Sequence, residues 1–107
     1  MPIIRIDYDN SKLKEKEVLD LSNAVQKIVS EVTGIEDVFV YANSSQIKVK
    51  IAPIEIFVEM SAPKIKDLDK LTEDIKTRVT EWKKEANFGY PINLTIIPMS
   101  WKIEIGI

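Results

Sequence analysis

The sequence predicts an α+β fold of two layers, in which duplicated β-α-β units form a four-stranded mixed sheet with two helices on one face. Strand-like segments alternate with two long amphipathic segments. The opening MPIIRI of residues 1–6 returns as APIEIF at 52–57, and SSQIKVKI at 44–51 is similar to SWKIEIGI at 100–107. A half with one helix buries too little surface to stand alone, so we expect the repeats 1–52 and 53–107 to share one domain.

The first repeat is expected to begin with an isoleucine-rich strand over residues 2–8. Turn and N-cap residues follow at 9–11, before a helix that ends at Gly34, where a glycine stop is typical. A β-rich segment at 38–42 comes next. In the predicted helix before Gly34, the apolar positions recur every three or four residues, as expected for one buried face: Val18, Leu21, Val25, Ile28 and Val32.

The second repeat is expected to follow the same order, with a strand at 54–60 and a helix that starts near Asp67 and ends before Asn87. A strand at 92–97 completes the sheet. The apolar positions of this helix are Leu68, Leu71, Ile75, Val79 and Trp82. Two further alternating segments, 47–51 and 102–107, predict short outer strands, so that each repeat reads βαββ.

Composition excludes several functional classes. The 15 lysines and arginines are balanced by 17 acidic residues, giving a net charge of −2, so no basic surface for nucleic acid is expected. The absence of cysteine and histidine removes thiol nucleophiles, imidazole chemistry and the usual zinc ligands, and we expect no cofactor or metal. No apolar stretch approaches the roughly 20 residues that span a bilayer, which predicts a cytoplasmic protein without a membrane partner.

The uncovered face of the predicted sheet indicates self-association. With both helices on one side, the other face and the short outer strands remain open, and natural proteins protect such edges or use them for pairing. Trp101, beside the last outer strand, is a candidate anchor for a contact between subunits. We therefore expect a homo-oligomer.

Several segments together resemble the tautomerase superfamily, which includes 4-oxalocrotonate tautomerase and macrophage migration inhibitory factor. They are Met1-Pro2 opening a strand, Val32-Thr33-Gly34 closing the first helix, Ser61-Ala62-Pro63-Lys64-Ile65 before the second helix, and Pro53-Ile54-Glu55-Ile56 opening the second repeat. The overall pattern is most similar to a bacterial family of uncharacterised tautomerase-fold proteins. The resemblance implies a homotrimer in which the nitrogen of Pro2 acts as general base after Met1 is removed. Ile35 stands where cytokine-like members carry lysine, and Asn93 and Thr95 appear in place of their tyrosine and asparagine.

Pro2 is the candidate catalytic residue. An α-amino group titrates near 8, closer to neutrality than lysine, and burial or a nearby cation would lower its pKa further. Lys64 and Arg5 are the candidate substrate-binding residues, because a cation is needed to hold the carboxylate of a small keto or enol substrate. While Met1 remains attached, the Pro2 nitrogen is an amide and cannot act as a base.

Each candidate also has a purely structural interpretation. A proline can open a strand without losing a ladder hydrogen bond, and Pro53 occupies the equivalent place with no possible free nitrogen. Arg5 could instead pair with Asp7, Glu55 or Glu59 across the sheet, and Lys64 could be an exposed loop residue. Two alternatives to an isomerase therefore remain: a non-catalytic binding or assembly module of this fold, and a ferredoxin-like domain that binds a small ligand.

Overall fold

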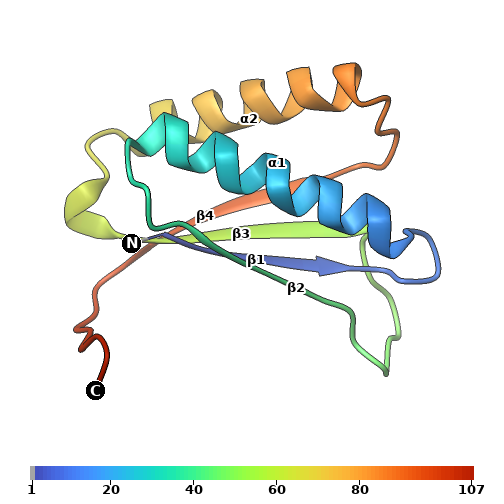
Figure 1. Ribbon diagram of the computed structural model, residues 1–107, viewed down its shortest axis with the longest axis horizontal. Helices are drawn as coiled ribbons and strands as arrows, with labels where there is room; N and C mark the ends of the chain where they lie inside the picture. Colours follow the sequence, from blue (N-terminus) through green and yellow to red (C-terminus); the bar gives the residue numbers. More distant parts are fainter. Residues whose placement is uncertain (1) are drawn as a thin grey trace.

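The computed structural model describes residues 2–107, so the state of Met1 lies outside it. It contains a four-stranded sheet in the order β2-β1-β3-β4 and two helices packed on one of its faces (Figure 1). The elements are β1 (Ile3–Tyr8), α1 (Glu15–Thr33), β2 (Phe39–Asn43), β3 (Ile54–Ser61), the short 3-10 helix η1 (Ala62–Lys64), α2 (Leu68–Glu85) and β4 (Asn93–Met99). The predicted two-layer α+β architecture is confirmed.

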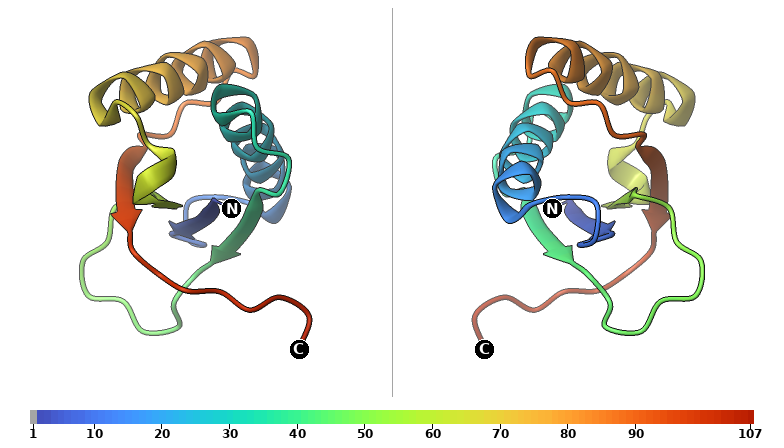
Figure 2. Two further views of the ribbon diagram at one scale, coloured as in Figure 1. Left: turned by 90° about the vertical axis from the view of Figure 1, so that its left-hand side faces the viewer. Right: turned by 90° about the vertical axis from the view of Figure 1, so that its right-hand side faces the viewer.

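The sheet shows the expected repeat. β1 pairs in parallel with β2, β3 pairs in parallel with β4, and the two units meet through the antiparallel pair β1–β3. Each helix connects two strands that are direct neighbours in the sheet. In a ferredoxin-like fold another strand lies between the two strands that a helix connects, so the ferredoxin-like alternative is wrong. The end views in Figure 2 show both helices on one side of the sheet, with the 44–53 loop and the C-terminal segment on the other.

The core lies between the helices and the covered face of the sheet. Even-numbered residues of the two central strands face the helices and are fully buried, as the period of two requires: Ile4, Ile6, Ile54, Ile56 and Val58. The helices contribute Leu21, Val25, Val29 and Ile75, which are also buried completely or almost so. Trp82 is half-buried and packs against the edge of this core, with its ring centre 5.1 Å from that of Phe88 and the two rings tilted by 44°.

Three of the four predicted helix ends agree with the structure: the end of α1 and both ends of α2. Gly34 closes α1 with a left-handed backbone at φ 72°, and the Asp67 side chain accepts a hydrogen bond from Lys70 N at 3.0 Å to begin α2. α1 begins later than expected, at Glu15. The reason is local, since the Asp9 carboxylate accepts hydrogen bonds from the backbone N–H and hydroxyl of Ser11 and forms a turn instead of a cap.

This turn makes the stability of the protein dependent on Asp9 ionisation. The two Ser11 hydrogen bonds, followed by the charges of Lys48 and Lys12, lower the Asp9 pKa despite the opposing effect of burial. A lowered folded-state pKa stabilises the fold above the unfolded value of about 3.9 and loses that contribution as pH falls through the folded value. We expect Asp9→Asn to destabilise the protein at pH 7 and to match the wild type below the folded pKa.

Urea unfolding at several pH values from 2 to 7 measures this difference. Asp20→Asn, on the exposed side of α1, is the matched control because it removes the same charge without disturbing a turn. A difference between Asp9→Asn and wild type that is constant across this pH range would contradict the expectation.

The prediction of two short outer strands, at 47–51 and 102–107, is wrong. Among the described residues, neither 47–51 nor 102–107 forms a strand. The first lies in the loop between β2 and β3, and the second lies in the segment that follows β4 (Figure 1). Their alternating apolar side chains are largely exposed, including Val49 at 100% and Ile105 at 82%. A strand needs a partner for its backbone hydrogen bonds, and a single copy of the chain places none beside these segments.

β4 also runs further than predicted, through Pro98 to Met99. It tolerates this proline because it is an edge strand, where a missing N–H need not disrupt a ladder. Within residues 2–107, no helix has both the length and the apolar character needed to cross a bilayer.

Candidate functional site at the Pro2 end of the sheet

Pro2 lies immediately before β1, and its side chain is fully buried. Its carbonyl oxygen accepts a hydrogen bond from Phe39 N at 3.3 Å, which ties it to the start of β2. In the antiparallel pairing Ile3 is opposite Glu59, so the next position along β3, Met60, is opposite Pro2. Pro2 therefore lies at the end of the sheet where β3 leads through η1 into α2.

A hollow of about 300 Å³ opens at the same end, between the C-terminus of α1 and the N-terminus of α2. We call it the N-terminal hollow. Its lining includes Met60 and four charged groups near the start of α2, Lys64, Lys66, Asp67 and Lys70. Met60 lies opposite Pro2 and lines the hollow together with Lys64, whereas Pro2 itself does not line it. A single chain therefore places Pro2 and Lys64 at the same end of the sheet but not in one cavity.

The charges in the N-terminal hollow are partly neutralised. Lys70 donates to Asp74 at 2.8 Å, and this contact raises the Lys70 pKa. The Asp67 carboxylate is occupied by capping α2. Among residues 2–107, Lys64 and Lys66 form no ion pair, so they are the cations available to an incoming carboxylate.

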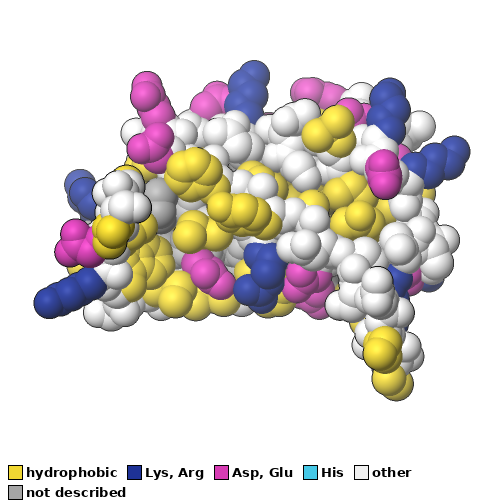
Figure 3. Space-filling model, turned by 60° about the horizontal axis from the view of Figure 1, so that its bottom comes forward, with side chains coloured by type: hydrophobic (Ala, Val, Ile, Leu, Met, Phe, Trp, Pro, Cys, Tyr) yellow, Lys and Arg dark blue, Asp and Glu magenta, His cyan; other side chains and the backbone are white. Residues whose placement is uncertain are grey.

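Arg5 lies on the opposite face of β1. Its Nε contacts Asp7 Oδ2 at 3.3 Å on the same strand, and its Nη1 contacts Glu59 Oε1 at 3.3 Å across the sheet on β3. Two of the three expected partners of Arg5 are thus confirmed. The guanidinium also lies 4.5 Å from the ring centre of Phe57. Figure 3 shows charged side chains crossing this open face among hydrophobic ones. Arg5 therefore lies on the other face of the sheet from the N-terminal hollow that Lys64 lines.

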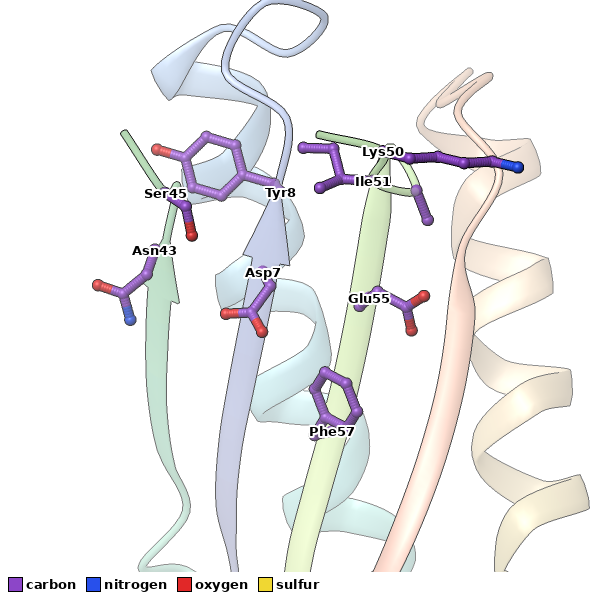
Figure 4. Close-up of a pocket in the computed structure, with 9 residues that line it drawn as sticks. Asp7, Tyr8, Asn43, Ser45, Lys50, Ile51, Glu55 and Phe57 are labelled. Atoms are coloured by element: carbon purple, nitrogen blue, oxygen red, sulfur yellow. The ribbon is translucent and has the colours of Figure 1, made fainter. Parts of the chain in front are cut away.

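The open face contains a second hollow, of about 430 Å³, at the end of the sheet away from Pro2 (Figure 4). Asp7 and Glu55 are directly opposite each other in its floor, and Lys50 and Ile51 reach it from the 44–53 loop. Both carboxylates already have partners, since Asp7 contacts Arg5 and Glu55 accepts from Asn93 Nδ2 at 3.0 Å. Neither carboxylate in the floor of this hollow is therefore free to act as an acid, a base or a ligand.

A third hollow, of about 270 Å³, lies on the open face at the Pro2 end. Ile3 and Glu59 line it from the sheet, while Trp101 and Lys102 line it from the C-terminal segment. Trp101 is half-buried there, which leaves part of its surface for the subunit contact predicted from sequence.

Sequence reasoning missed both hollows on the open face. The alternation around Lys50 and Lys102 predicts outer strands, and the sequence contains no local signal that these residues instead lie in loops that line surface hollows. Within the described part of the chain, no group of three or more acidic side chains could hold a metal ion.

Comparison with known proteins gives matches at the level of structure. Neither a protein-family model nor a curated protein matches this sequence. A fused 4-OT wild type symmetric trimer matches with a TM-score of 0.70 and 10% identity, over 98% of this chain and 94% of that one. A domain of unknown function (DUF1904) from Sebaldella termitidis gives 0.69 and 16%, over 100% and 98%. A macrophage migration inhibitory factor-like protein from Entamoeba histolytica gives 0.60 and 19%, over 96% and 93%.

These matches cover nearly the whole of each chain and include the cytokine-like, 4-OT and uncharacterised bacterial types that the resemblance indicated. At such low identity they show the fold and not the activity. The chain has the tautomerase fold.

Proposed function

We propose that the protein is a cofactor-independent tautomerase or isomerase, in which Pro2, freed by removal of Met1, acts as general base on a small keto or enol carboxylate. The observation that carries this proposal is the burial of Pro2 at the end of the sheet that also holds the N-terminal hollow. Burial lowers the proton affinity of an amine, which favours a base that works near neutral pH.

Lys64 is the proposed carboxylate-binding residue. It lines the N-terminal hollow, is exposed, and forms no ion pair among residues 2–107. A cation in this place would hold the substrate carboxylate while the Pro2 nitrogen moves a proton between carbon and oxygen. Arg5 could bind a substrate carboxylate only if a substrate or a second subunit displaced Asp7 or Glu59. Its proposed role within one chain is to hold these two carboxylates in place on the open face of the sheet.

The assembly proposed is a homotrimer. Its support is the pair of exposed apolar segments, 47–51 and 102–107, which lack partners in one copy, and the trimeric state named for one structural neighbour. Pairing with the sheet edge of another copy would satisfy the backbone groups of these segments and bury their side chains.

A second candidate is a non-catalytic binding or assembly module of the same fold. It is favoured by the equivalence of the two repeat-opening prolines. Pro2 O accepts from Phe39 N at 3.3 Å and Pro53 O accepts from Asp9 N at 3.0 Å, so both make a backbone contact that needs no free nitrogen. Pro2 therefore has a structural role at the start of β1, whether or not its nitrogen also acts in catalysis.

The distinguishing experiment compares protein whose intact mass shows complete removal of Met1 with protein carrying an N-terminal extension that keeps Pro2 acylated. Phenylenolpyruvate and 2-hydroxymuconate are the test substrates. We expect turnover only with the free amine, and a loss of about 10²-fold or more in Pro2→Ala, because positioned general bases contribute about 10²–10⁴-fold. Circular dichroism and solution molar mass would show that all three proteins have the same fold and assembly.

Equal turnover in the acylated and free proteins would refute the catalytic role of the amine. Retention of Met1 on essentially every natively expressed chain would favour the non-catalytic module.

A further inference from the structure

A narrow groove runs between α2 and the edge strand β4, on the helix-covered side of the sheet. Its volume is about 170 Å³. Ile56, which is fully buried, forms part of its floor together with Val79, and Ile92 and Leu94 provide a half-buried wall. An apolar cavity of about 150 Å³ can hold a benzene molecule, so this groove has room for a body of about six carbon atoms.

The rim of the groove is basic. Lys76 and Lys83 line it from α2, seven residues apart and therefore about two helical turns. Among the described residues, no acidic side chain lines the groove. Lys76 has one exposed acidic neighbour, Glu73, at 3.8 Å, and Lys83 forms no ion pair within residues 2–107. The N-terminal hollow differs because Asp67 and Asp74 line it beside its lysines.

We propose that the α2–β4 groove is a binding site for a small amphiphilic carboxylate, with an apolar body of about six carbon atoms lying on Ile56 and Leu94 and its anionic head at the lysine rim. Burial of the body removes apolar surface from water, and the rim supplies charge of the opposite sign. The site is separate from the Pro2 end of the sheet and requires neither a free Pro2 nitrogen nor turnover.

The direction of α2 predicts how the ligand lies. Lys83 is in the last turn of α2, where the helix dipole presents its negative end and disfavours an anion, whereas Lys76 lies in the helix interior. The carboxylate therefore binds closer to Lys76, and the apolar body extends toward Ile92. Lys76 contributes more to affinity than Lys83.

Titration of the full chain with hexanoate, followed by ¹H–¹⁵N NMR, tests the proposal. Saturable shifts are expected at Val79, Thr80 and Leu94, with much weaker binding of hexanamide and hexylamine. Lys76→Gln is expected to weaken hexanoate binding about fivefold, because hydrogen bonds to charged groups are strong but exposed pairs are screened by solvent. Lys83→Gln should weaken it less.

Lys84→Gln is the matched control, since Lys84 is an exposed lysine of the same helix that does not line the groove. Its affinity for hexanoate should equal that of the wild type. Equal binding of hexylamine, equal losses in all three lysine variants, or shifts centred on Lys64 and Lys66 would overturn the proposal. An absence of saturable shifts at millimolar hexanoate would overturn it as well.

Discussion

Val49→Asp combined with Ile105→Asp is expected to convert the proposed homotrimer into monomers. Both side chains are almost wholly exposed in one copy, at 100% and 82%, so they contribute little to the fold of the single chain. In the proposed trimer each becomes buried against another copy, where an apolar side chain contributes about 1.5–3 kcal/mol. Replacing it by a carboxylate removes that contribution and adds the cost of burying an unpaired charge.

The measurement is solution molar mass by light scattering across a range of protein concentrations, with circular dichroism to establish that the monomer remains folded. We expect the dissociation constant of the assembly to rise by at least about 10²-fold, since each 1.4 kcal/mol changes it tenfold. Leu19→Asp is the matched control because Leu19 is also an exposed apolar residue, at 60%, but lies on α1 away from both segments. Monomeric wild-type protein, or equal dissociation in Leu19→Asp, would contradict the proposed interface.

Ile6→Ala is expected to lower the free energy of unfolding by about 2–5 kcal/mol. Ile6 is fully buried on the central strand β1, opposite Ile56 of β3 and beside Ala42 of β2. Shortening its side chain loses apolar contact and leaves a cavity that strands fixed on both sides can fill only in part. Because domains of this size are stable by only about 5–15 kcal/mol, this loss is a large fraction of the total.

Urea unfolding at fixed protein concentration measures the effect, since dissociation of an oligomer would otherwise alter the apparent stability. Thr95→Ala is the matched control, because Thr95 is exposed on β4 and its replacement should change stability by no more than about 0.5 kcal/mol. A loss below about 1 kcal/mol in Ile6→Ala would show that the sheet and helices do not form a tightly packed core around Ile6.

Much of the fold could be predicted from the sequence because each element carries its own periodic signal. Alternation at period two identified β3 and assigned Ile54, Ile56, Val58 and Met60 to one face, which is buried in the structure. The isoleucine-rich composition of residues 2–8 identified β1. Helical spacing identified α1 and α2, and Gly34 marked a helix end through the backbone freedom of glycine. The internal repeat indicated that two such units would share one sheet.

The same local signal led to the wrong assignment at 47–51 and 102–107. Alternation states which side chains share a face, but a strand forms only when a partner satisfies its backbone, and no local pattern contains that partner. The candidate site shows the same division. Pro2 and Lys64 were identified through the family resemblance, whereas the contact of Arg5 with Glu59 depends on the register between β1 and β3.

The sequence by itself determined the two β-α-β units, and its resemblance to a known family pointed to Pro2 and Lys64 as candidate site residues. Only the tertiary structure decided that Arg5 faces away from the helices, that two alternating segments remain without strand partners, and that a lysine-rimmed groove lies between α2 and β4. The physical reason is distance along the chain. Periodicity and capping act over a few residues, whereas hollows and ion pairs arise where strands and helices far apart in sequence come together.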